Sequence, residues 1–127
     1  MSGNLDEFDV IISGSDQVLN PSFLLNGEGR GTETPTYFLG FDFNGKKVGY
    51  ALSFGCVEYP YKALPIAAKY LKDLDVISVR EKTGIDIVKA MGRNDVILVP
   101  DPTLMMPLSN YHQLADESAI KNKNYII

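Results

Sequence analysis

Residues 75–99 read DVISVREKTGIDIVKAMGRNDVILV, and this stretch decides the fold class. Apolar, β-branched runs at 75–79 and 95–99 predict two strands. Between them, apolar residues recur at helical spacing over 82–91, and Gly92 supplies a left-handed stop. A strand, a helix and a strand in succession predict two parallel strands joined by a right-handed crossover.

The same alternation extends toward the N-terminus. Residues 8–12 form a mostly apolar run, which predicts a strand covered on both faces of a parallel sheet, and 47–52 predict another strand. A helix is expected from about 64 to 74, with Pro65 in its first turn. Residues 36–39 are expected to be a short extended piece. The predicted fold class is therefore α/β, a parallel sheet with flanking helices.

Composition and charge narrow the functional classes. The 127 residues suffice for one domain, and a net charge of −4 disfavours nucleic-acid binding. The chain has no apolar run of the roughly 18 residues that a transmembrane segment needs. Its N-terminus does not resemble a signal peptide and Cys56 is its single cysteine, so a cytoplasmic location is expected. No metal-ligand spacing is visible, and we expect neither a metal nor a cofactor.

Each predicted strand ends in a small or polar loop. Ligands of open α/β sheets bind beyond the carboxyl ends of the strands, so these loops are the candidate binding site. The candidate substrate-binding residues are Gly14, Ser15, Asp16, Gln17, Ser53, Gly55, Arg80, Glu81 and Asp101.

Several of these residues also have a purely structural interpretation. Asp16 could contact a ligand or cap the following turn. Arg80 could hold an anion at a helix N-terminus, or form an ion pair with Asp101 or Glu81. Ser53 could line the cleft or shape a tight turn. We expect Asp101 to brace the loops rather than to take part in a reaction.

Four segments end the predicted strands in order: FDVIISGSDQVLNP at 8–21, YALSFG at 50–55, ISVRE at 77–81 and VPDPTL at 99–104. Together they resemble the four signatures of the polysaccharide pyruvyl transferase family, over about residues 8–106. The resemblance implies a Rossmann-like domain within a two-domain enzyme similar to the GT-B glycosyltransferases.

Members of that family transfer a pyruvyl group from phosphoenolpyruvate to a sugar or sugar-lipid hydroxyl, in the biosynthesis of bacterial exopolysaccharides and other surface polysaccharides. The resemblance implies that 1–120 form a partial N-terminal domain, and that 121–127 are a linker and the first strand of a C-terminal domain. The family's catalytic histidine and a donor-binding basic residue belong to that second domain, so no catalytic residue is assigned here and the chain alone is expected to be inactive. Leu19 stands where the family often has Trp.

A non-catalytic module that binds sugars or nucleotides, or that serves assembly, is the alternative. The reason to consider it is that the domain carrying the family's catalytic histidine is absent. An exposed sheet edge and the tail at 125–127 could pair with another copy to form a homodimer. His112, the single histidine, has no neighbours resembling a triad or metal set, and we expect it at the surface.

Overall fold

The computed structural model describes residues 5–26 and 35–114. In chain order, with η for a 3-10 helix, the elements are η1 (Leu5–Glu7), β1 (Val10–Gly14), α1 (Pro21–Asn26), η3 (Thr36–Phe38), β2 (Lys46–Leu52), α2 (Leu64–Leu71), β3 (Val76–Val79), α3 (Lys82–Ala90), β4 (Ile97–Leu98), η4 (Pro102–Met105) and α4 (Leu108–Leu114). The four strands form one parallel sheet in the order β1-β2-β3-β4. This confirms a Rossmann-like α/β fold with flanking helices. The GT-B-like two-domain arrangement stays a prediction.

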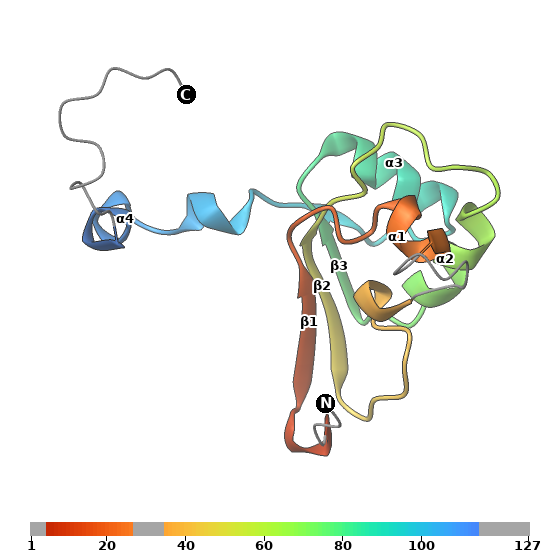
Figure 1. The fold of residues 1–127 in the computed structure, drawn as a ribbon, viewed down its shortest axis with the longest axis horizontal. Helices are drawn as coiled ribbons and strands as arrows, with labels where there is room; N and C mark the ends of the chain where they lie inside the picture. Colours follow the sequence, from red (N-terminus) through yellow and green to blue (C-terminus); the bar gives the residue numbers. More distant parts are fainter. Residues whose placement is uncertain (1–4, 27–34, 115–127) are drawn as a thin grey trace.

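The strand order places the helices on one side of the sheet. Each strand lies beside the next one in the chain, and a right-handed crossover that always steps in the same direction returns on the same face. Figure 1 shows this layer, with α1, α2 and α3 gathered on one side of the strands.

The core lies between the sheet and this helix layer. From the sheet, Leu52, Ile77 and Val79 are almost fully buried, and from the helices Leu71 and Val88 are fully buried. These side chains come from alternate strand positions and from one stripe of each helix, which are the two apolar patterns that identified the elements in the sequence.

The prediction that the first strand is covered on both faces is wrong. In β1 the side chain of Ser13 points into the protein and is buried, whereas Val10 and Ile12 point to the other side and are exposed, Ile12 to 65%. Tyr50 of β2 and Val76 of β3 are exposed as well. The physical reason is the strand order, because every crossover in the described ranges returns over the opposite face.

Two local predictions also need correction. Residues 36–39 are not extended: Thr36–Phe38 form η3, and Leu39 follows in the left-handed conformation with φ 53°. The Pro35 carbonyl accepts from the backbone N–H of Phe38 and of Gly40, each at 3.0 Å, so the segment closes on itself as a turn. The strand expected over 95–99 is limited to β4, because it pairs with β3 at only two positions.

After β4 the chain leaves the body of the domain. Residues 102–114, here called the arm, comprise η4 and α4 and extend away from the helix layer to the other side of the strands (Figure 1). Tyr111 of α4 donates its hydroxyl hydrogen to the Thr103 carbonyl, which ties the two short helices together. The predicted linker and strand at 121–127 lie outside the described residues.

Candidate functional site

The loops after the strands meet at one edge of the sheet, here called the rim. The N–H of Leu19, in the loop after β1, donates to the Ser53 carbonyl after β2 at 3.1 Å. The N–H of Arg80, after β3, donates to the Leu52 carbonyl at 3.2 Å. Parallel strands present their carboxyl ends at the same edge, so the loops were expected to meet there, and the structure brings them together.

Arg80 lies at the centre of the rim. Its Nη1 donates to Asp101 Oδ2 at 2.6 Å, its Nε donates to Glu81 Oε1 at 3.2 Å, and its Nη2 lies 3.8 Å from Asp16 Oδ1. Burial pulls the pKa of Arg80 down, but its hydrogen bonds to Asp101 and Glu81 outweigh this and the net pKa is raised. The ion-pair interpretation of Arg80 is confirmed with both partners named in the sequence, and Asp16 is a third.

Asp101 braces two loops, as expected. One carboxylate oxygen, Oδ2, accepts from Arg80, while Oδ1 accepts from the Thr103 backbone N–H at 2.9 Å and from its hydroxyl at 2.8 Å. These bonds from Thr103, followed by the one from Arg80, lower the pKa of Asp101. Sequence reasoning included Thr103 in this loop but gave it no role. The signal was an Asp at a helix N-terminus with a hydroxyl residue two positions on.

The rim carries more negative than positive charge. One guanidinium, from Arg80, faces three carboxylates, from Asp16, Glu81 and Asp101, which gives the cluster a net charge of −2. Asp16 is the most open of them: its side chain is 91% exposed, and its Oδ1 also accepts from the Gln17 N–H at 2.8 Å. Its carboxylate both shapes the turn and keeps acceptor capacity toward solvent.

The remaining predicted residues shape the two neighbouring loops. Ser53 is buried and its hydroxyl accepts from the Gly55 N–H at 3.2 Å, which fits the tight-turn interpretation. Gly55 has φ +62°, and a Cβ there would lie 2.4 Å from Gln17 Oε1, so this position suits glycine. Gly14 ends β1 against the backbone of β2, and the half-buried Ser15 begins the loop beside it. Ligand binding by these residues stays a prediction.

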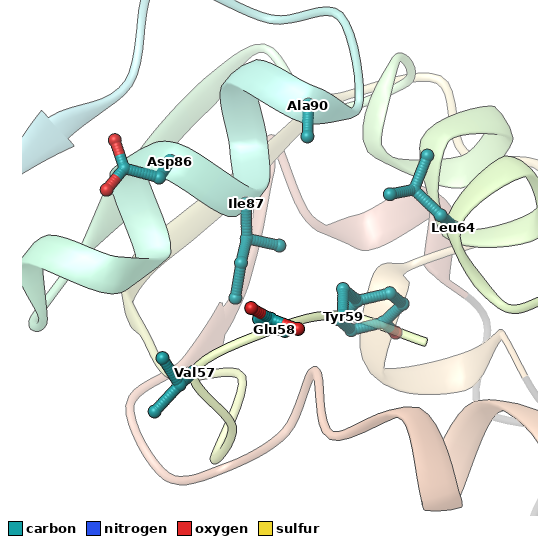
Figure 2. Close-up of a pocket in the computed structure, with 7 residues that line it drawn as sticks. All are labelled: Val57, Glu58, Tyr59, Leu64, Asp86, Ile87 and Ala90. Atoms are coloured by element: carbon teal, nitrogen blue, oxygen red, sulfur yellow. The ribbon is translucent and has the colours of Figure 1, made fainter. Parts of the chain in front are cut away.

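A separate groove of about 330 Å³ lies away from these residues (Figure 2). Segment 57–59 lies on one side of it and α3 on another, with Leu64 of α2 beside them. Its lining is Val57, Glu58, Tyr59, Leu64, Asp86, Ile87 and Ala90. Burial, with a smaller effect of Cys56, raises the pKa of Tyr59, whose hydroxyl donates to the Leu19 carbonyl at 3.2 Å. None of the predicted site residues lines this groove.

Across residues 5–26 and 35–114, no group of three or more His, Cys, Asp or Glu side chains could hold a metal ion. No helix in the same ranges has the length and hydropathy to cross a bilayer. His112 is exposed on α4, as expected.

A four-stranded parallel sheet with flanking helices and with polar loops gathered at its carboxyl edge is consistent with a Rossmann-like α/β domain. The family model for polysaccharide pyruvyl transferase matches residues 3–126. The chain therefore belongs to the polysaccharide pyruvyl transferase family. Comparison with curated proteins and with solved structures gives no match.

Proposed function

We propose that this chain supplies the acceptor-binding part of a polysaccharide pyruvyl transferase that uses phosphoenolpyruvate, in bacterial surface polysaccharide biosynthesis. In that reaction two sugar oxygens bond to C2 of the enolpyruvyl group and phosphate leaves from C2. One hydroxyl proton goes to C3 and the other to the departing phosphate. The product is a pyruvyl ketal. A cytoplasmic setting, where phosphoenolpyruvate is made, suits this chemistry.

The observation that carries the proposal is the surplus of carboxylates around Arg80. Phosphoenolpyruvate is an anion with a phosphate and a carboxylate, and it needs unoccupied cationic groups. The guanidinium of Arg80 already faces three carboxylates, and their net negative charge repels a further anion. Sugar hydroxyls, in contrast, donate well to carboxylates. The rim therefore suits the acceptor better than the donor.

The donor and the proton source are proposed to belong to the second domain that the family resemblance implies. The reaction needs a general acid for C3, and histidine is the side chain that most often fills such a role. His112 is the chain's single histidine and lies exposed on the arm rather than among the rim loops. We therefore propose that residues 1–120 act as a partial domain and are inactive without the other half.

Titration of the full chain by amide NMR tests the acceptor assignment. The probes are methyl glycosides of galactose, mannose and N-acetylmannosamine, and separately phosphoenolpyruvate. We expect saturable shifts at Ser15, Asp16 and Gly55 with at least one glycoside and none with phosphoenolpyruvate. Asp16→Asn should weaken glycoside binding, whereas Asp42→Asn, an exposed carboxylate ahead of β2 at the opposite end of the sheet, should not. Saturation by phosphoenolpyruvate alone would overturn the assignment.

Phosphate release from phosphoenolpyruvate with the same glycosides tests the inactivity of the isolated chain. We expect no release above the protein-free rate, and turnover would overturn this part of the proposal. The alternative is a non-catalytic sugar- or nucleotide-binding module. Saturable rim shifts with UDP-galactose or UDP-glucose, and none with the methyl glycosides, would favour it.

A further inference from the structure

One face of the sheet presents a mainly apolar surface, here called the open face. Its members are Val10, Ile12, Val48, Tyr50, Val76 and Ile97. Strand register aligns them: Ile12 is paired with Val48, and Val48 with Val76, so these three form a row across β1, β2 and β3. A row of apolar side chains that faces water is a feature of interaction surfaces rather than of a finished α/β domain.

The described part of the chain offers no cover for this face. Sheets made only of parallel strands almost always have both faces covered. Here the connections that contain α1, α2 and α3 all return on the other side (Figure 1).

The arm carries a matching set of apolar side chains. Within residues 102–114 there is no Asp, Glu, Lys or Arg, although charged residues make up 22% of the chain. Leu104 is 76% exposed and Leu114 78%, and Met105 and Leu108 are also exposed. The arm makes no extensive contact with the sheet or the helix layer, and it lies on the side of the strands away from that layer (Figure 1).

We propose that the open face binds the arm of a second copy of this chain, reciprocally, in a two-fold symmetric dimer. Each copy carries one apolar arm and one apolar face, so two copies satisfy both surfaces without another partner. At the paired strand positions the open face carries one charged side chain, Lys46 at the start of β2, which is paired with Val10, so the contact is mainly apolar. The inference does not depend on the sugar assignment of the rim.

The dimensions favour arm exchange over stacking of the sheets alone. Four strands about 4.8 Å apart and about five residues long at 3.3 Å each give a face of roughly 300 Å². A stable interface buries about 800 Å² per partner. The sheet face alone falls short, whereas reciprocal exchange uses both a face and an arm from each copy.

Pairing through the sheet edge, which the sequence suggested, would leave the apolar side chains of the open face exposed to water. A second strand beside β1 would satisfy backbone N–H and C=O groups but would only widen the exposed apolar face. Contact with the face itself is what removes the apolar side chains from water.

Analytical ultracentrifugation of the full chain over a range of concentrations tests the dimer. We expect a concentration-dependent dimer for the wild type. Ile12→Glu places a charge on the open face and should raise the dimer Kd roughly tenfold or more. The double change Leu104→Ser and Leu108→Ser should do the same from the arm. Tyr61→Glu, at a position 91% exposed on the loop before α2, is the matched control and should leave Kd unchanged.

Mixing the two weakened variants separates arm exchange from other modes. The Ile12→Glu chain keeps an intact arm and the Leu104→Ser, Leu108→Ser chain keeps an intact face, so the mixture restores one of the two contacts and should dimerise more tightly than either variant alone, though less tightly than the wild type. A mixture that dimerises no more tightly than the separate variants would overturn the arm–face pairing. A wild type that remains monomeric at all concentrations would overturn the proposal as well. In that case, resistance of an Ile12→Cys variant to maleimide would show that another segment of the same chain covers the open face.

Discussion

Replacement of Arg93 by methionine is expected to destabilise the domain strongly. Arg93 follows α3, and its Nη1 donates to the carbonyls of Leu71 and Leu74 at 3.1 and 2.7 Å. These carbonyls lie at the end of α2 and in the turn that leads to β3, where helix carbonyls have no partner within the helix. The other edge of the guanidinium, Nε and Nη2, donates to Asp95 at 2.8 and 2.6 Å. One side chain thus ties the end of α2 to the segment entering β4.

The magnitude follows from the two carbonyl bonds. A hydrogen bond to a charged group contributes about 1.5–3 kcal/mol, and both acceptors are in a part-buried setting. Methionine keeps the aliphatic packing but donates no hydrogen bond. Taking the lower figure for each bond, Arg93→Met should lower the free energy of unfolding by about 3 kcal/mol. That is a large part of the roughly 5–15 kcal/mol typical of a domain.

Urea denaturation followed by circular dichroism measures this loss. With a slope of about 2 kcal/mol/M, the midpoint should fall by roughly 1.5 M. Arg93→Lys should lower the free energy of unfolding by an intermediate amount, because an ammonium can donate to one carbonyl but cannot also donate two hydrogen bonds to Asp95. Asp95→Asn should cost much less because that side of the pair faces water. A loss below about 0.5 kcal/mol for Arg93→Met, or equal losses for Arg93→Met and Asp95→Asn, would refute the account.

The same pair gives a pH signature. Hydrogen bonding to Arg93 lowers the pKa of Asp95 to about 2. A carboxylate with a depressed folded-state pKa stabilises the fold above its unfolded pKa of about 3.9, and that contribution disappears as pH falls toward 2. The stability difference between wild type and Asp95→Asn should therefore shrink below about pH 4. A difference that stays constant through this range would contradict the assignment.

Three further tests address the loops. Gly55 and Gly92 have φ +62° and +91°, so alanine at either should cost about 1–2 kcal/mol from left-handed strain; in urea, Gly55→Ala should lose slightly more, because a Cβ there must also displace the ends of the Gln17 and Asn20 side chains, whereas one at Gly92 meets nothing within 4 Å. Thr103→Val removes the hydroxyl bond to Asp101 and keeps the backbone one, so it should raise the pKa of Asp101 in part, which carbon NMR titration follows, and the stability that this carboxylate loses on acidification should become smaller; an unchanged pKa would show that the Thr103 hydroxyl does not hold it down. Burial raises the pKa of Cys56, so its alkylation by iodoacetamide at about pH 8 should be slower than that of a model thiol and should recover in urea, whereas equal rates would argue against burial.

Much of the fold could be predicted because its signals are local. The helical spacing over 82–91 and the β-branched runs on either side place β3, α3 and the start of β4 within a few residues of where they lie. The rim could be predicted for a related reason. Once strands are parallel, their carboxyl ends meet, so Arg80 and Asp101 are neighbours although 21 residues separate them.

What the sequence could not reveal depends on contacts that no local pattern encodes. The run at 10–12 is apolar on both sides, so periodicity alone could not show that Ile12 faces outward. Arg93 was missed because its partners are backbone carbonyls about 20 residues away, which can be of any residue type. Thr36–Phe38 contain residues that favour strands, but the Pro35 carbonyl and a left-handed Leu39 close the segment into a turn.

The strand order links the rim to the open face. An order that steps in one direction keeps all carboxyl ends at one edge and all crossovers on one side, so it produces a rim of convergent loops and an uncovered face from the same cause. A doubly wound sheet covers its second face by reversing direction, and ligands bind at the point of reversal. No reversal occurs among the four described strands. The rim is therefore formed by the charged loops around Arg80 and not by a reversal of strand order. For the same reason, any cover for the open face comes from outside the segment that runs from β1 to β4.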